Sequence, residues 1–185
     1  MKIFPGFLLV ITCIILFGFN NINPAVNLNI TAGLKSPECL GEKFSKFKIR
    51  RPDGTQFSNS NFKNKIVFVT FWQKSSPFCR EELDAFNEMF EKLKDSSNFI
   101  FALFSPDSDS AINEIVATKK VKYNFLHMSA DECFRISHGF GFPSSFIVDK
   151  RGKIVYYIPS RIITDKEISK TTVMDEYYPN IMKLL

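Results

Sequence analysis

The chain has 185 residues and a mass of 21.3 kDa, which suits one compact domain and is too short for two ordinary ones. Hydrophobic residues make up 45% and charged residues 23% of the chain, so a core can form and wholesale disorder is excluded. The 24 basic and 19 acidic residues give a net charge of +5. They read as spread along the chain without a basic block or interleaved stacking aromatics, so nucleic-acid binding is not expected.

Cysteine and histidine usage limits the metal and disulfide chemistry. Four cysteines are too few for a disulfide scaffold and lack the paired spacing of a zinc site. His127 and His138 are the only histidines in the sequence, which excludes a histidine-rich metal site. We therefore expect neither a metal ion nor another cofactor.

The N-terminus indicates the compartment. Lys2 is followed by an uncharged apolar run over residues 3–19, which is typical of a secretory signal and close to the lower length limit of a membrane-spanning helix. We expect residues 1–19 to be a signal peptide or a membrane anchor, residues 20–38 a linker, and residues 39–185 the folded domain. Either alternative predicts an exported, periplasmic or extracytoplasmic protein, and the second attaches it to the membrane through residues 3–19.

The first half of the domain predicts two strands and a helix. Residues 44–50 read as a strand that runs into a Pro-Asp-Gly turn at residues 52–55. Residues 66–72 are almost continuously apolar and rich in β-branched and aromatic side chains, which favours a strand buried on both faces. Residues 80–94 carry apolar side chains at helical spacing.

The second half continues the alternation of strands and helices. Residues 98–104 predict another buried strand, and residues 107–119 a helix that begins with polar capping side chains. Residues 145–148 and 153–158 flank a glycine-containing turn and predict a hairpin. Residues 174–185 can form a closing helix. This order implies an α/β protein with a mixed central sheet and helices on both faces, which is the order of the thioredoxin fold.

The segment between the second predicted strand and the first predicted helix indicates the protein family more specifically than the order of elements does. Residues 71–83 read Phe-Trp-Gln-Lys-Ser-Ser-Pro-Phe-Cys-Arg-Glu-Glu-Leu. Here the chain resembles exported thioredoxin-like redoxins of the cytochrome-maturation thiol reductase branch, within the alkyl hydroperoxide reductase/thiol-specific antioxidant superfamily. Those proteins carry Trp-Cys-x-x-Cys-Arg-x-Glu at this place. The likeness extends over roughly residues 40 to 160 through four further stretches: residues 64–65, 104–107, 141–144 and 146–154.

The family resemblance implies where the functional site lies and which residues form it. In the family the first motif cysteine is exposed and activated at a helix N-terminus, the second is more buried and resolves the mixed disulfide, and a cis-proline loop presents its backbone to a thiol or disulfide protein partner. Carried over, it assigns the following candidates: Ser76 at the position of the lost nucleophilic cysteine, Cys79 as the candidate catalytic residue, Trp72 and Pro77 in support of the motif, and Phe142, Pro143 and Ser144 in the partner-binding loop. The bond between Phe142 and Pro143 is expected to be cis.

The serine leaves three interpretations of Cys79 open. A hydroxyl does not ionise near neutral pH or form a disulfide, so two-cysteine exchange within Ser76-Pro77-Phe78-Cys79 is excluded. The motif can be a degenerate scaffold, which makes the domain a non-catalytic module that binds an extended peptide or a partner protein. It can support one-cysteine chemistry, as in a peroxiredoxin-like peroxidase. Alternatively, Cys79 pairs with Cys39 or Cys133.

The family resemblance therefore implies a thiol–disulfide oxidoreductase or antioxidant type of protein, impaired or one-cysteine in its chemistry. The residues around the motif have plainer interpretations. Cys133 is expected to pack on the apolar side of a short helix, and Cys39 to lie on a surface segment. Arg80, Glu81 and Glu82 are expected to form a solvated helix start, where carboxylates also suit the helix dipole.

Overall fold

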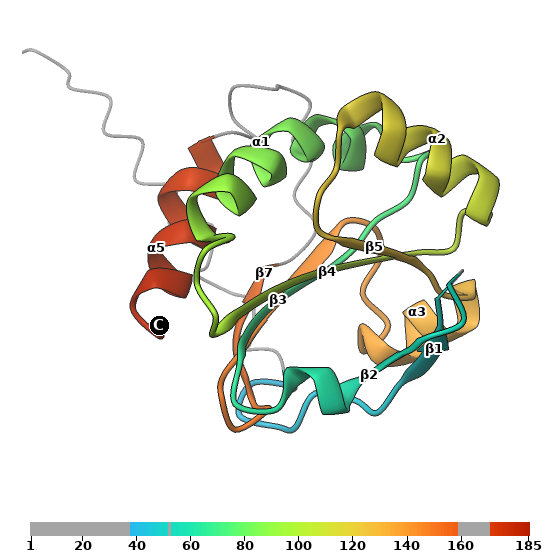
Figure 1. Cartoon of the computed structure of the whole chain (residues 1–185). Helices are drawn as coiled ribbons and strands as arrows, with labels where there is room; N and C mark the ends of the chain where they lie inside the picture. The colour runs from blue at the N-terminus through green and yellow to red at the C-terminus, as the bar shows by residue number, and fades with distance from the viewer. Residues whose placement is uncertain (1–37, 52, 159–170) are drawn as a thin grey trace, which may run out of the picture. The chain divides into compact units, whose positions relative to one another are not determined.

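A five-stranded mixed sheet forms the centre of the domain, in the strand order β5-β4-β3-β6-β7 (Figure 1). Its strands are β3 (Ile66–Phe71), β4 (Phe99–Ser105), β5 (Asn124–His127), β6 (Ser144–Val148) and β7 (Ile154–Ile158). Strands β3, β4 and β5 are parallel to one another. Strand β6 runs antiparallel to them, and β7, which pairs antiparallel with β6, has the same direction as β3. The predicted mixed sheet is confirmed, with β5 as a strand that the sequence pattern did not reveal.

This computed structural model describes residues 38–51, 53–158 and 171–185. The expected signal or anchor over residues 1–19, and the linker up to residue 37, lie outside the described residues. Within the ranges described, no helix is long and apolar enough to cross a membrane.

Strand β3 is the middle strand of the sheet and is buried on both faces. All six of its side chains are buried, and they alternate between two hydrophobic clusters, with Phe68 in one and Val69 in the other. The strand pairs with β4 on one side and with β6 on the other. A continuous apolar run is therefore required, because neither face of the strand meets water.

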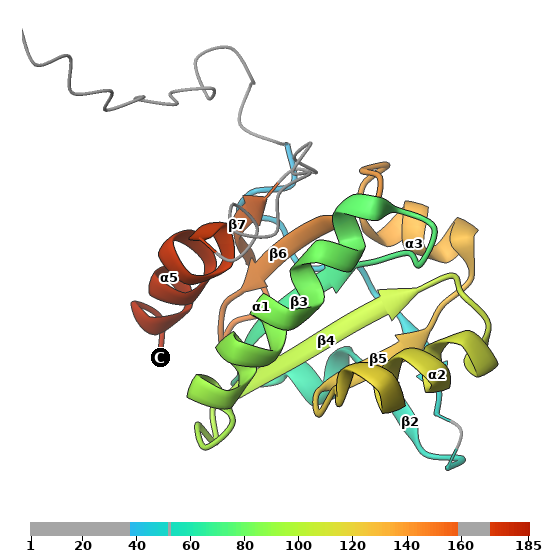
Figure 2. The same ribbon diagram turned by 90° about the horizontal axis from the view of Figure 1, so that it is seen from above.

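Helices cover both faces of the sheet, as predicted (Figure 2). The first cluster packs beneath α1 (Pro77–Leu93), α2 (Asp109–Lys119) and the C-terminal segment, which is a π-helical turn (η2, Val173–Tyr177) followed by α5 (Tyr178–Met182). The second cluster packs against α3 (Ala130–Ile136) and the short 3-10 helix η1 (Asn59–Phe62). The predicted closing helix is thus present but is interrupted by the π-helical turn.

The N-terminal part of the domain adds a small antiparallel hairpin of β1 (Lys48–Arg50) and β2 (Gln56–Ser58). The predicted turn forms between them, where the Asp53 carboxylate accepts hydrogen bonds from the Thr55 backbone N–H at 2.8 Å and hydroxyl at 2.6 Å. The predicted strand over residues 44–50 is shorter than expected. Only its last three residues pair in a ladder, because the preceding residues are held by a side chain of η1.

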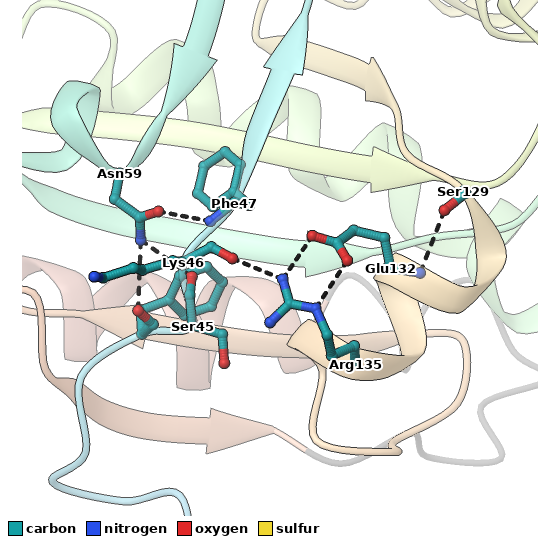
Figure 3. A network of polar contacts seen from close by, with 8 residues as sticks. Ser45, Lys46, Phe47, Asn59, Ser129, Glu132 and Arg135 are labelled. Atoms are coloured by element: carbon teal, nitrogen blue, oxygen red, sulfur yellow. Dashed lines mark hydrogen bonds and ion pairs between the residues drawn. The ribbon is translucent and has the colours of Figure 1, made fainter.

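That side chain is Asn59. Its Oδ1 accepts a hydrogen bond from the Phe47 backbone N–H at 2.8 Å, and its Nδ2 donates to the Ser45 carbonyl at 3.1 Å (Figure 3). These bonds satisfy backbone groups that would otherwise need a neighbouring strand. The Phe47 ring is buried against Phe104 of β4, with ring centroids 5.1 Å apart.

Candidate functional site

The motif segment and the proline loop lie at the same end of two neighbouring strands, β3 and β6. Phe71, the last residue of β3, pairs with Ser144, the first residue of β6. Trp72 therefore leaves the sheet beside the point where Pro143 enters it. The bond between Phe142 and Pro143 is cis, as predicted. The sheet register thus brings together two segments that are about 70 residues apart in the chain.

Ser76 begins helix α1. Its backbone is extended, with φ −77° and ψ 118°, and its hydroxyl oxygen accepts a hydrogen bond from the Cys79 backbone N–H at 3.4 Å. Pro77 occupies the first turn, where the missing N–H of proline costs no helical hydrogen bond. Ser76 is thus the N-cap of α1.

Trp72 is hydrogen-bonded to the first turn of α1. The indole is 1% exposed, and its Nε1–H donates a 2.6 Å hydrogen bond to the Cys79 carbonyl. Its ring makes an edge contact with Phe125 of β5 at a centroid distance of 5.3 Å. The indole thus connects the motif helix to the sheet edge through one polar and one aromatic contact.

Cys79 is buried in the first turn of α1, with 0% of its surface exposed. The sulfur accepts a hydrogen bond from the Gln73 backbone N–H at 3.4 Å. Burial raises the pKa of the Cys79 thiol to about 12, against the opposing effect of hydrogen bonds from Ser76 and Gln73. The nearby Glu82 carboxylate raises the pKa further. At neutral pH the group is a protonated thiol that solvent does not reach.

Glu82 corrects the expectation of a solvated helix start. The residue is 3% exposed, and its Oε2 is buried without a hydrogen-bond partner among the described residues. Burial raises the pKa of the Glu82 carboxyl to about 8. Glu82 is one turn after Cys79 and one turn before Phe86, both of which face the core. This spacing was the available signal in the sequence.

Tyr123 is a second buried polar group that sequence reasoning missed. Its ring stacks on Phe101 at a centroid distance of 4.0 Å, and its hydroxyl is buried with no hydrogen-bond partner in the part of the chain that the structure describes. Burial raises its pKa, and the charges of Asp84 and Glu82 act in the same direction. The cluster beneath α1 therefore contains two polar atoms whose hydrogen bonding is incomplete.

The proline loop is positioned by α3. Ser129 caps this helix by accepting a hydrogen bond from the Glu132 backbone N–H at 3.3 Å. Arg135 pairs with Glu132 at 2.6 Å and donates to the Lys46 carbonyl at 2.7 Å (Figure 3). These contacts attach α3 to the segment before β1, so the loop that follows α3 starts from a fixed helix.

Within the loop, the side chains differ in exposure. Phe142 is partly buried and packs against both hydrophobic clusters. Pro143 and Ser144 are buried, and the Ser144 hydroxyl has no hydrogen-bond partner within residues 38–51, 53–158 and 171–185. Of residues 141–144, solvent therefore reaches only the exposed Gly141 and the partly buried Phe142 to a significant extent.

The other two cysteines of the described domain are buried as well. Cys133 packs in α3 with its thiol 3.5 Å from the Met128 carbonyl, as the packing interpretation predicted. Cys39 is only 3% exposed, so the expectation of a surface position is wrong. Residues 41–43 pair with Lys153 and Ile154 at the start of β7, and the nearby Cys39 belongs to the second hydrophobic cluster. Cys39, Cys79 and Cys133 are all free thiols, so the pairing of Cys79 with either of the others is not seen.

A groove of about 390 Å³ lies between α1 and α2 beside the motif. Its floor includes Trp72, Leu83 and Ile115. Four of the lining residues form two ion pairs: Lys74 with Glu114 at 2.8 Å, and Lys119 with Asp84 at 3.1 Å. The sequence pattern did not indicate this groove, because its lining comes from two helices and a strand end.

Comparisons with known proteins agree with this architecture. The thiol-disulfide oxidoreductase ResA of Bacillus cereus is 28% identical over 140 residues, which cover 74% of this chain and 81% of that protein. Peroxiredoxin Q from the chloroplast of Oryza sativa subsp. japonica is 26% identical over 142 residues, covering 71% and 64% respectively. The solved structure of a thiol-disulfide oxidoreductase from Bacteroides fragilis superposes with a TM-score of 0.61 at 16% identity, covering 78% of this chain and all of that one, which shows the shared fold.

The profile of the AhpC/TSA family matches residues 40–157, which is more than half of the chain. The match includes the motif helix, the proline loop and the hairpin that follows it. The chain therefore belongs to the AhpC/TSA family, as a thioredoxin-fold redoxin related to thiol–disulfide oxidoreductases.

Proposed function

We propose that this protein is an exported redoxin that binds thiol- or disulfide-containing proteins at its proline loop and does not exchange disulfides at its motif. Membrane attachment through residues 3–19 is part of the proposal. The observation that carries it is the burial of Cys79 behind the helix cap Ser76. Relatives named as thiol-disulfide oxidoreductases support the class of partner.

The chemistry of exchange explains why these two residues matter. A thiolate attacks one sulfur of a partner disulfide, forms a mixed disulfide and releases the other sulfur as a thiolate. A second thiol must then attack the mixed disulfide to release the partner in reduced form. Ser76 cannot supply the attacking thiolate. Cys79 is protonated at neutral pH and has no exposed surface, so neither step proceeds at the motif.

Thiol accessibility and turnover test the proposal together. In the folded protein, Cys79 should resist an alkylating reagent until a denaturant is added, and a model disulfide should not be reduced catalytically. Substitution Ser76→Cys recreates a two-cysteine motif on the same helix turn, so this variant should form an internal disulfide and gain dithiol reductase activity. Ser75→Cys is the matched control, because it adds a thiol one residue before the cap.

Two results would contradict the proposal. Turnover by the unaltered protein would assign a catalytic role to a thiol outside the motif, with Cys39 and Cys133 as the candidates. Rapid alkylation of Cys79 without denaturant would show that the motif opens readily.

A one-cysteine peroxidase is the second candidate, favoured by the likeness to peroxiredoxin Q. In that reaction the thiolate attacks one oxygen of the peroxide, which leaves a sulfenic acid on sulfur and releases water or an alcohol. The raised pKa of Cys79 and its burial oppose it. Peroxide consumption that disappears in a Cys79→Ser variant would establish the peroxidase.

A further inference from the structure

The positive charge of the chain is concentrated in one short region. Residues 42–65, which span β1, β2 and η1, hold seven basic and two acidic side chains, a net charge of +5. The remainder of the chain holds 17 of each sign. This corrects the first impression that the basic residues are evenly spread. An asymmetry of this kind indicates a surface for an anionic partner.

Three of these cations form a row along β1. Lys46, Lys48 and Arg50 are exposed, whereas the intervening Phe47 is buried and Ile49 partly buried. Alternation places the three charged side chains on the outward side of one extended segment, about 6.6 Å apart. We call Lys46, Lys48 and Arg50 the basic face.

The basic face is not neutralised by neighbouring carboxylates. None of the six ion pairs among the described residues includes a base from residues 42–65. On β2, the register partners of Lys48 and Arg50 are Ser58 and Gln56, which are uncharged.

Two acidic residues lie near the rim of the basic face. Glu132 and Lys48 line one cleft, and Asp109 and Arg50 line another. Glu132 is already paired with Arg135, and the Lys46 ammonium points away from it (Figure 3). The face therefore keeps a net positive charge.

We propose that the basic face lies against the anionic head groups of a lipid bilayer. The inference deepens the proposed membrane attachment, on which it rests. The 18 residues between Phe19 and the first described residue, Glu38, can span at most about 60–65 Å. An anchored domain is thereby kept at high effective concentration near the membrane. Basic side chains held near a membrane anchor are attracted electrostatically to anionic lipid head groups.

Two alternatives to lipid binding exist. The basic face could bind another anionic partner, or its lysines could only prevent association between strand edges. A nucleic acid would also attract the face, but an exported domain does not meet one routinely. Lysines on the open side of a short strand can also serve only to prevent edge-to-edge association. Both readings give results different from lipid binding in the following test.

The test measures backbone deuterium uptake over residues 44–58 in the full chain. The protein is bound to phosphatidylcholine vesicles with or without phosphatidylglycerol, and vesicles with the anionic lipid should slow the uptake several-fold. High salt should abolish this difference, because surface charges are screened. Substitutions Lys46→Gln, Lys48→Gln and Arg50→Gln together should abolish it as well.

A triple variant of the same charge change serves as control: Lys92→Gln, Lys120→Gln and Lys183→Gln, all exposed and outside the hairpin. It should behave as the unaltered chain, and thermal unfolding should verify that both variants fold. Intact mass shows whether the N-terminal segment has been removed. If it has, the released protein is measured on the same vesicles, so failure of the anchor and failure of the face are distinguishable.

Four outcomes would overturn the assignment. Equal uptake on both kinds of vesicle excludes lipid contact at the face. Protection that persists in the triple variant at the face locates the contact elsewhere. Self-association of that variant, without any lipid effect in the unaltered chain, assigns the lysines to edge protection. Uptake slowed by a short oligonucleotide but not by anionic vesicles would favour a nucleic acid.

Discussion

The indole N–H of Trp72 donates a 2.6 Å hydrogen bond to the backbone carbonyl of Cys79, seven residues later. This bond closes the motif loop on itself, because it ties the end of β3 to the first turn of α1. The loop that would have to move to expose the thiol is therefore held at both ends.

Substitution Trp72→Phe tests this closure. It removes the donor and part of the ring, and should lower the free energy of unfolding by about 2 kcal/mol. It should also speed the alkylation of Cys79 in the folded protein. Phe125→Leu is the control, because it removes the ring contact and keeps the hydrogen bond. If the two variants alkylate at the same rate, the hydrogen bond does not govern opening.

Substitution Ser76→Ala tests the role of Ser76 as a cap. Loss of the hydroxyl leaves the Cys79 backbone N–H without its acceptor and should cost about 1 kcal/mol in urea unfolding. Ser108→Ala, at the corresponding position of α2, should cost a similar amount. A negligible effect of Ser76→Ala alone would mean that the Ser76 hydroxyl does not cap the helix.

Glu82 should make stability depend on pH. An ordinary glutamate titrates near 4.5, whereas burial raises the pKa of Glu82 to about 8. Between these values the folded state binds more protons than the unfolded state, so stability falls as pH rises through this range. Glu82→Gln should remove that slope and raise the free energy of unfolding at pH 8 by about 2–4 kcal/mol.

Chemical denaturation at several pH values measures this effect. Glu81→Gln is the control, because Glu81 is partly exposed on the neighbouring position of α1. A variant at Glu82 with the same slope as the unaltered chain would show that the carboxyl is already solvated or paired.

Tyr123→Phe should be neutral or stabilising, by up to about 1 kcal/mol. The substitution keeps the ring stacked on Phe101 and removes a buried hydroxyl for which the described residues supply no hydrogen-bond partner. The thermal midpoint is the measurement. A clear loss of stability would indicate that the hydroxyl bonds an internal water molecule.

Much of the fold could be predicted because its main signals are local. The apolar run of β3 and the Pro-Asp-Gly turn before β2 both identify their elements without a partner. Strand β5 was missed because Asn124–His127 has only two apolar residues and ends in an exposed histidine. Its identity as a strand comes from pairing with β4, which is a tertiary effect.

The conformation of the proline loop and the position of the motif at the start of α1 could be predicted, but the environments of the side chains in the candidate site could not. The family resemblance located the motif and the proline loop, and the cis bond at Pro143 followed from it. Burial did not follow, because the polar neighbours of Cys39 and Glu82 suggest solvent exposure. Cys39 is buried in the second hydrophobic cluster, whose other members come from distant parts of the chain, and Glu82 lies on the side of α1 that faces the core. Such placement depends on packing between elements, which a single sequence does not show directly.

The three buried thiols make the described domain a built-in probe of its own unfolding. Cys79 belongs to the cluster beneath α1, whereas Cys39 and Cys133 belong to the cluster on the other face of the sheet. Each sulfur becomes reactive only when its own side opens. Pulsed alkylation followed by mass spectrometry can therefore time the release of the two faces separately, without any introduced label.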